Sequence, residues 1–60
     1  MSLTIEQAVD AIFDAGFNLW DFNLAGGTLD SEGVWTFPDI HEGSGHVVVW
    51  VSSGETYVEY

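Results

Sequence analysis

The spacing of apolar residues changes at Gly16, and this change constrains the fold more than any other feature of the sequence. Before Gly16, apolar side chains recur every three or four residues, as on one face of an α-helix. After it, apolar and polar residues alternate in short runs separated by turn residues, which is typical of β-strands. In a chain of 60 residues, this order predicts a single α+β domain spanning residues 1–60. One helix would pack on a three- to four-stranded antiparallel sheet.

The expected helix covers residues 5–15, and both of its ends carry recognisable signals. Thr4 and Gln7 form the T-x-x-Q pattern of a capping box, which satisfies backbone donors at a helix start. Gly16 stands where a helix commonly ends in a left-handed residue, and Phe17 is placed to fold back on the last turn. The apolar stripe expected to face the sheet comprises Ile5, Ala8, Val9, Ile12 and Phe13.

The alternating runs after the helix predict short strands bounded by turns that contain Gly or Pro. Trp20, Phe22 and Leu24 form the first alternating set. Pro38 ends a later run because proline cannot donate a ladder hydrogen bond. The expected strands are residues 20–24, 34–37, 46–51 and 55–60, with a further short piece at 28–29.

The last two expected strands form a hairpin whose register can be derived from the sequence. A loop of two or four residues around Ser53–Gly54 gives the same pairing, whereas a slip of one residue would exchange the faces of one strand. The face expected to lie under the helix carries Val47, Val49, Val51, Val58 and Tyr60. The opposite face carries Val48, Trp50 and Tyr57, bordered by His46, Glu55 and Glu59.

The charge balance of the chain is unusual because cations are missing. Ten acidic residues stand against no Lys and no Arg, which gives a formal net charge of −10. Charged residues make up only 17% of the chain, below the roughly 25% of an average domain. Self-repulsion of this size destabilises a compact state. A working acidic surface or a very salty environment would offset that cost.

The expected helix carries a ladder of carboxylates, which we call the helix ladder: Glu6, Asp10 and Asp14. Their spacing of four residues stacks them on one helix face, about 6 Å apart along the axis. Phosphates along one DNA strand are separated by a similar distance. Asp14 lies in the last turn, where the helix dipole disfavours an anion. The alternative interpretation is an ordinary solvated helix face.

The remaining acids and the aromatic face of the hairpin are the other candidates for a binding surface. Asp21, Asp30, Glu32 and Asp39 fall on expected strand or turn positions, where acids are common for local reasons. Large aromatics inside a charged rim, such as Trp50 with Tyr57, are typical of interface anchors. Alternatively, this face is covered by the loop 39–45, by residues 25–33 or by a second copy of the chain.

Several other chemistries are poorly supported by the residues present. His41 and His46, with Asp39 and Glu42 nearby, have only a generic spacing, so no metal site and no cofactor are expected. Without Cys, Lys or Arg, and with little room for a pocket, the chain is not expected to be an enzyme. Direct binding to nucleic acid or to an anionic membrane is not expected, because both depend on cations.

No signal peptide and no membrane-spanning segment are expected, since the longest apolar run, VVVWV at 47–51, is far too short to cross a bilayer. The sequence therefore predicts a cytoplasmic protein.

By composition and charge layout, the chain resembles the small acidic DNA-mimic inhibitors encoded by phages, which include anti-CRISPR proteins and, as a second choice, anti-restriction proteins. The resemblance implies a monomeric, non-catalytic protein in the host bacterial cytoplasm. It would bind a Lys- and Arg-rich surface, such as the part of a CRISPR effector that reads the PAM, and block target DNA. The residues expected to bind the partner are Glu6, Asp10, Asp14, Asp21, Asp30, Glu32, Trp50, Glu55, Tyr57 and Glu59.

Two further interpretations belong to other classes. The chain could be an adaptor domain from an extreme halophile, where acidic surfaces stay hydrated in high salt, although halophilic proteins generally retain Arg. It could also be an acidic interaction module that dimerises through the face carrying Trp50.

Overall fold

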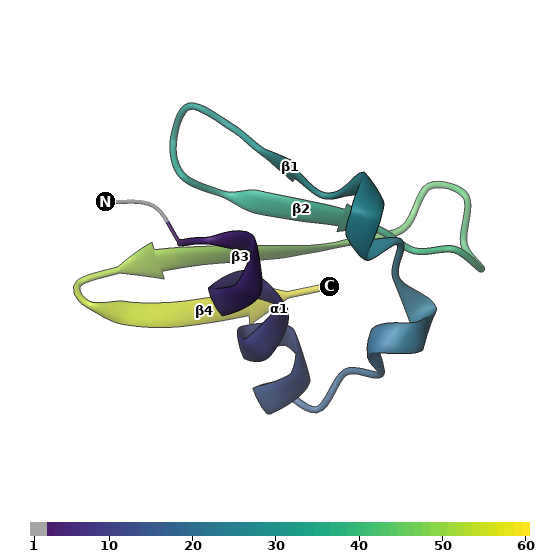
Figure 1. Ribbon diagram of the computed structural model, residues 1–60, viewed down its shortest axis with the longest axis horizontal. Coiled ribbons are helices and arrows are strands. Elements are labelled where there is room, and N and C mark those ends of the chain that lie inside the picture. The colour runs from purple at the N-terminus through teal and green to yellow at the C-terminus, as the bar shows by residue number, and fades with distance from the viewer. Residues whose placement is uncertain (1–2) are drawn as a thin grey trace.

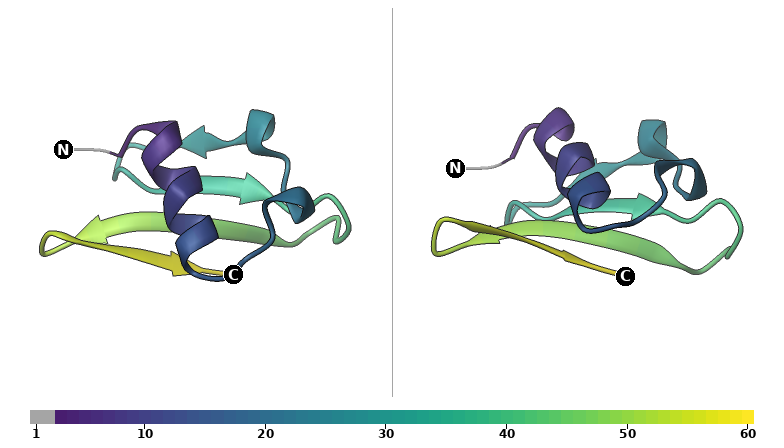
Figure 2. Two further views of the ribbon diagram at one scale, coloured as in Figure 1. Left: turned by 60° about the horizontal axis from the view of Figure 1, so that its bottom comes forward. Right: turned by 90° about the horizontal axis from the view of Figure 1, so that it is seen from below.

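The computed structural model describes residues 3–60 and has two layers, a helix and a sheet (Figures 1 and 2). The α-helix is α1 (Ile5–Asp14), and two short 3-10 helices follow it, η1 (Leu19–Asp21) and η2 (Leu24–Gly26). The strands are β1 (Thr28–Leu29), β2 (Trp35–Pro38), β3 (His46–Ser52) and β4 (Glu55–Glu59). They form one antiparallel sheet in the order β1-β2-β3-β4. The predicted α+β arrangement is therefore confirmed.

Both ends of α1 are stabilised by the interactions that the sequence predicts. The Thr4 hydroxyl accepts a hydrogen bond from the Gln7 amide at 3.2 Å, and the Thr4 amide donates to Gln7 Oε1 at 2.9 Å. At the other end, Gly16 has a φ of 92°, and the amide of Phe17 donates to the carbonyl of Ile12 at 3.3 Å. This left-handed residue with its return bond forms a Schellman motif. The helix ends at Asp14, one residue before the predicted end.

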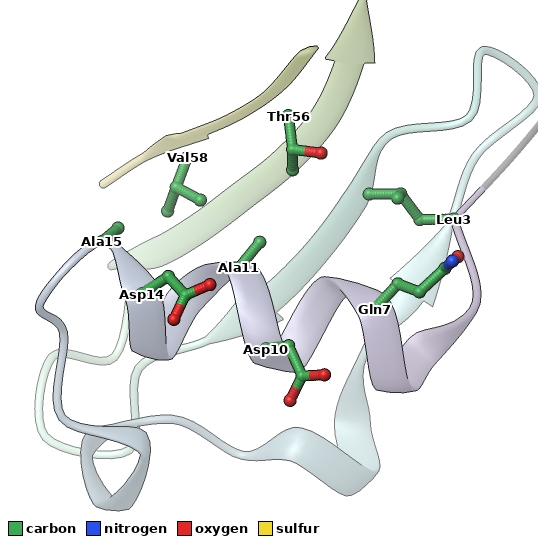
Figure 3. A pocket seen from close by; sticks show the side chains of 8 residues that line it. All are labelled: Leu3, Gln7, Asp10, Ala11, Asp14, Ala15, Thr56 and Val58. Atoms are coloured by element: carbon green, nitrogen blue, oxygen red, sulfur yellow. The ribbon is translucent and has the colours of Figure 1, made fainter. Parts of the chain in front are cut away.

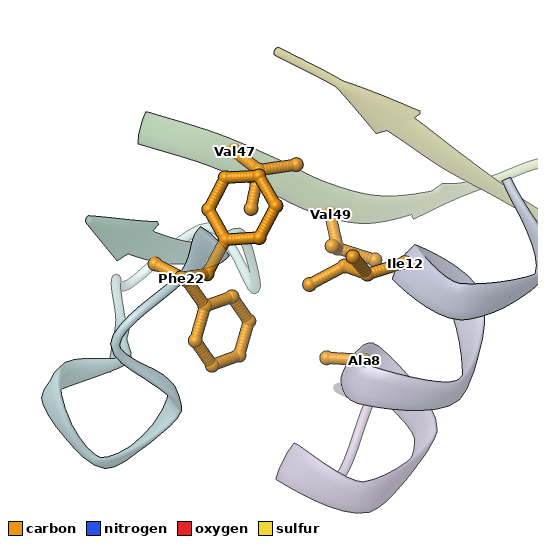
Figure 4. Close-up of a cluster of buried hydrophobic side chains, with 6 residues drawn as sticks. Ala8, Ile12, Phe22, Val47 and Val49 are labelled. Atoms are coloured by element: carbon orange, nitrogen blue, oxygen red, sulfur yellow. The ribbon is translucent and has the colours of Figure 1, made fainter. Parts of the chain in front are cut away.

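The hydrophobic core lies between α1 and the sheet (Figure 4). The prediction that Val47 and Val49 face the helix is confirmed, since both are fully buried, and Val58 opposite Val49 is half-buried. The register between β2 and β3 adds Trp35 and Phe37 to the same face. The buried cluster consists of Ala8, Ile12, Phe22, Phe37, Val47 and Val49.

Two residues of the predicted core face of the hairpin are exposed instead. Val51 lies near the tip of the β3–β4 hairpin, and Tyr60 follows β4 with 55% of its surface exposed. The reason is a difference in length. The ten residues of α1 span about 15 Å, whereas the seven residues of β3 span about 23 Å. The helix therefore covers only the middle of the hairpin.

The predicted apolar stripe of the helix is also narrower than expected. Ala8 and Ile12 are buried and Val9 is half-buried, but Ile5 and Phe13 are exposed. Consecutive residues point about 100° apart around a helix axis, so Phe13 is turned well away from the direction of Ile12. Its side chain is 67% exposed.

The strand predicted at residues 20–24 does not form, and this prediction was wrong. η1 and η2 occupy the segment, and the Asn18 and Asn23 side chains accept hydrogen bonds from the amides of Trp20 at 3.0 Å and Gly26 at 3.2 Å. Such local side-chain bonds compete with a strand ladder for the backbone donors. The segment makes one isolated antiparallel bridge, between Phe22 and Asp39.

The sheet starts instead with the short piece that follows these turns. β1 pairs with β2, placing Leu29 opposite Trp35. β3 and β4 pair in the predicted register, with Trp50 opposite Tyr57. The other side of the sheet bears no helix (Figure 2), so the molecule has one covered and one open sheet face.

Candidate functional site

All acidic side chains in the described part of the chain lie at the surface, and none is buried. Since the sequence contains no Lys or Arg, these carboxylates have few cationic partners. The only ion pair within residues 3–60 joins His41 Nε2 to Asp21 Oδ1 at 3.2 Å. It depends on a protonated imidazole. The surface therefore presents its negative charge almost without internal compensation.

The helix ladder forms a continuous exposed row on α1. Asp10 and Asp14 border an open groove between α1 and β4, and Figure 3 shows both carboxylates on the same side of the helix. Ala11, Ala15 and Val58 contribute apolar surface to this groove. Small alanine side chains leave room there beside the carboxylates. The groove can therefore accept an aliphatic stem whose charged end reaches Asp10 or Asp14, as an Arg or Lys side chain would.

The aromatic pair predicted on the hairpin lies on the open face of the sheet. The rings of Trp50 and Tyr57 are stacked, with centroids 5.6 Å apart and planes inclined by 20°. The Tyr57 hydroxyl donates to Glu55 Oε2 at 3.0 Å. Tyr57 is 41% exposed and Trp50 is half-buried. Neither the loop 39–45 nor residues 25–33 encloses the two rings. The pair therefore stays accessible to a partner.

The predicted partner-binding residues do not form one surface. Val58 and Val49 face the helix, so the alternation along each strand turns Glu59, Tyr57 and Trp50 to the opposite side of the sheet. The helix ladder lies on the layer above. A flat partner can therefore contact the helix layer or the open sheet face, but not both at once.

Two of the predicted acids have local structural roles. The Asp30 carboxylate accepts hydrogen bonds from the amides of Glu32 at 2.8 Å and Val34 at 3.0 Å, which shapes the turn between β1 and β2. Asp21 pairs with His41 and is half-buried. Glu32 is exposed in the turn. These positions add negative potential, but Asp30 and Asp21 are already engaged within the chain.

The loop 39–45 is organised by Asp39. Its carboxylate accepts hydrogen bonds from the amides of His41 at 2.7 Å and Glu42 at 3.2 Å, and from the hydroxyl of Tyr60. These bonds, with the Tyr60 bond the largest cause, hold the pKa of Asp39 below its usual 3.8. Among residues 3–60, no three His, Asp or Glu side chains converge as metal ligands.

The structure also reveals a surface that the sequence reasoning missed. An apolar depression, which we call the aromatic hollow, lies between the end of α1 and η1. It is lined by Phe13, Phe17, Asn18, Leu19, Trp20 and Leu24. Trp20 is 84% exposed, although it was expected to share one face of a strand with Phe22 and Leu24. Asn18 and Asn23 were the available signal, because Asn favours turns over strands.

Among residues 3–60, no helix has both the length and the apolar character needed to span a membrane. The chain matches no family model, no curated protein and no solved structure. Its function must therefore be inferred from its own residues and their arrangement.

Proposed function

We propose that this protein is a non-catalytic inhibitor that occupies the basic DNA-binding surface of a CRISPR effector complex and so keeps target DNA out. The observation that carries the proposal is the helix ladder, an exposed row of carboxylates on a folded domain without a single Lys or Arg. Like charges four residues apart destabilise a helix by a few tenths of a kcal/mol per pair. Because the helix ladder lowers the stability of α1, its presence is best explained by a partner that supplies the missing cations.

The geometry of α1 suits such a partner. Asp10 and Asp14 repeat at about the spacing of neighbouring phosphates and stand over the groove that borders β4. A guanidinium group binds a carboxylate through two parallel hydrogen bonds, as it binds a phosphate. The Arg and Lys side chains that grip duplex DNA near a PAM would meet the helix ladder in the same way.

The mechanism requires binding alone. The net charge of −10 attracts the protein to a basic channel and accelerates encounter. Once bound, the inhibitor competes with DNA by mass action. The site of action is the bacterial cytoplasm, where effector complexes search for DNA. The inhibitor acts as a monomer, because two copies would bring two charges of −10 together with no cation between them.

Competition for duplex DNA tests the proposal. Purified type I surveillance complexes and Cas9–guide RNA complexes are incubated with the protein, and their binding to PAM-containing duplexes is measured by gel shift. We expect DNA binding to at least one effector to fall as inhibitor concentration rises. Undiminished DNA binding by every effector would overturn the proposal, and the same assay with restriction enzymes would then test the anti-restriction alternative.

Two matched variants show which face of the protein, the helix layer or the open sheet face, competes with DNA. The helix variant combines Asp10→Asn with Asp14→Asn, and the sheet variant combines Glu55→Gln with Glu59→Gln. Both lose two of the ten acidic charges, so they have the same net charge. We expect the helix variant to compete poorly and the sheet variant to compete almost as well as the native protein. Equal losses would mean that total charge, rather than the helix ladder, drives binding.

A further inference from the structure

The aromatic hollow exposes more aromatic surface than the fold explains. Trp20 is 84% exposed and Phe13 is 67% exposed, whereas Phe17, Leu19 and Leu24 behind them are half-buried. Single exposed apolar residues are common, but a contiguous apolar depression on a small domain marks a contact surface. The hollow has almost no polar lining apart from Asn18.

Phe13 and Trp20 take no part in the aromatic contacts of the described chain. The pairs formed within residues 3–60 join Phe17, Phe22, Tyr60, Trp35, Phe37, Trp50 and Tyr57. Trp50 and Tyr57 on the open sheet face already stack on each other, and Tyr57 is hydrogen-bonded to Glu55. The rings of Phe13 and Trp20 are by comparison free to pack against another molecule.

The hollow and the helix ladder adjoin at the end of α1. Phe13 lines the hollow, while the next residue, Asp14, borders the groove beside β4 together with Asp10. Asp21 follows Trp20 in the chain, but its carboxylate is paired with His41 and does not line the hollow. The apolar surface of the hollow and the acidic surface of the helix ladder are therefore neighbours at the end of α1.

Charge decides between the possible occupants of this surface. A second copy of the chain would bring another −10 and no Lys or Arg, so its rim would repel Asp14. A basic partner would place its cations on the carboxylates that flank the hollow. An Arg side chain could also stack on the exposed face of Trp20. The complementary occupant is therefore an apolar side chain flanked by Arg or Lys.

We propose that the aromatic hollow is the anchor of the inhibitory interface and receives an apolar side chain of the partner that is flanked by Arg or Lys. This inference rests on the proposed function, because it takes the partner to be the basic surface that the helix ladder binds. Energy in protein interfaces concentrates in a few central aromatic residues surrounded by polar contacts. Phe13 and Trp20 fill that central role, and Asp14 and Asp10 form part of the rim.

Two probe peptides of equal length and charge test the recognition chemistry directly. One alternates Arg with Leu and the other alternates Arg with Ser, and each is titrated into the native protein while amide shifts are followed by NMR. We expect the Arg–Leu peptide to bind more tightly, with the largest shifts around Phe13, Phe17 and Trp20. Equal affinities, no binding, or shifts centred on Trp50 and Tyr57 would overturn the inference.

Substitutions at exposed positions provide the controls. Trp20→Ala should remove the preference for the Arg–Leu peptide, because it weakens binding of that peptide strongly and of the Arg–Ser peptide only by the loss of Arg stacking on the indole. Ile40 is also an exposed apolar residue, 58% accessible, but it does not line the hollow, so Ile40→Ala should keep the preference. Well-dispersed NMR spectra of both variants would show that each remains folded. A preference that survives Trp20→Ala would contradict the inference.

The DNA-competition assay separates this inference from the proposed function. Where the native protein inhibits an effector, Trp20→Ala should weaken inhibition by roughly 30-fold, the effect of a hot-spot aromatic. Inhibition that is unchanged by Trp20→Ala would overturn the anchor while the function stands. If no effector is inhibited but the peptide preference holds, the function fails and the hollow remains a site for a basic, apolar partner. A dimeric mass abolished by Trp20→Ala would instead assign the hollow to a second copy.

Discussion

The hydroxyl of Tyr60 donates a hydrogen bond to the carboxylate of Asp39 and so joins the segment after β4 to the loop between β2 and β3. The ring of Tyr60 also lies against Phe17, with centroids 6.2 Å apart, and against Phe22, with centroids 5.9 Å apart. One side chain therefore connects the end of the sheet to the loop and to the segment that follows the helix. The bond lowers the pKa of Asp39 and, together with desolvation, raises the pKa of Tyr60 to about 12.

We expect this bond to make stability depend on pH at both extremes. Since the pKa of Asp39 is depressed in the folded state, its contribution is present above the usual value of 3.8 and is lost as pH falls through the folded value. The raised pKa of Tyr60 acts in the opposite direction. Its contribution is complete below pH 10 and is lost as pH rises from 10 through about 12. Urea unfolding across this pH range measures both losses.

Tyr60→Phe isolates the effect from the general titration of the other carboxylates. The variant keeps the ring contacts and removes only the hydroxyl. We expect it to be less stable than the native protein at neutral pH and to approach the native stability at pH 3 and pH 12. Absorbance near 295 nm should show a tyrosinate forming at about pH 12 that is absent from Tyr60→Phe and retained in Tyr57→Phe. A constant stability difference across all pH values would contradict the role of the bond.

Gly27 allows a test of core packing at a position where a glycine meets the core. A Cβ on Gly27 would lie 2.3 Å from Cε1 of Phe37, a fully buried ring of the core. We expect Gly27→Ala to lower the free energy of unfolding by about 1–3 kcal/mol, as overpacked cores do. Gly43→Ala is the matched control, since a Cβ there meets nothing within 4 Å. The control should be neutral or slightly stabilising, by up to about 1 kcal/mol. Equal urea midpoints for both variants would contradict this account.

The elements that could be predicted from the sequence are those fixed by neighbouring residues. The capping box of Thr4 and the left-handed Gly16 define α1 within one turn at each end. The β3–β4 register follows from a two-residue turn, in which Ser53 and Gly54 both have positive φ, a geometry that matches the twist of a hairpin. In both cases the deciding interactions span only a few positions of the chain.

The segment between α1 and β1 could not be predicted, because two interpretations of it compete on equal terms. The alternation of Trp20, Phe22 and Leu24 favours a strand, whereas Asn18 and Asn23 favour local turns. In the structure Phe22 is buried in the core while Trp20 is exposed, so the alternating side chains do not share one environment. The aromatic hollow was missed as a consequence, since alternation assumes that large apolar side chains are buried.

The separation of the candidate residues between two faces follows from the predicted hairpin register, whereas their role in binding a partner stays a prediction. The register itself places Trp50 and Tyr57 on the side of the sheet opposite the helix ladder. Which face binds a partner stays a prediction, and the helix and sheet variants described above distinguish them.

We expect that replacing Asp14 by Lys stabilises the fold. Asp14 lies in the last turn of α1, where the helix dipole disfavours an anion, and four residues after Asp10. Asp14→Lys reverses both effects and adds a favourable pair with Asp10. We expect the free energy of unfolding to rise by about 0.5–1.5 kcal/mol at low salt, measured by urea unfolding, while competition with DNA weakens.

Asp14→Asn is the control for this substitution, because it removes the negative charge without adding a positive one. Its stabilisation should be smaller, and high salt should reduce the gain of both variants. A loss of stability in Asp14→Lys would mean that the carboxylate serves the fold. Unchanged DNA competition would mean that the helix ladder is only a solvated face.

Salt dependence separates a DNA mimic from a halophilic domain, since both account for a net charge of −10. Salt screens the repulsion between exposed carboxylates over about 10 Å at 0.1 M and over shorter distances at higher concentrations. We expect the protein to be folded at about 0.15 M salt, as seen by circular dichroism. Its melting temperature should then rise by a few degrees towards 1 M, because a gain of 1 kcal/mol shifts a domain of this size by roughly 4–8 °C. A halophilic domain would instead lose its structure at low salt.

Binding should respond to salt in the opposite direction from stability. Charge pairs between the helix ladder and a basic partner weaken as ions screen them, so inhibition of DNA binding should decrease steeply with salt even while the fold becomes more stable. DNA itself also binds less tightly in salt, so the inhibitor must be measured by direct titration with the effector in the absence of DNA. The helix variant, with two carboxylates fewer, should show a shallower salt dependence than the native protein. An affinity that is independent of salt would contradict an interface built on carboxylates and would leave the contacts of Phe13 and Trp20 as its main source of energy.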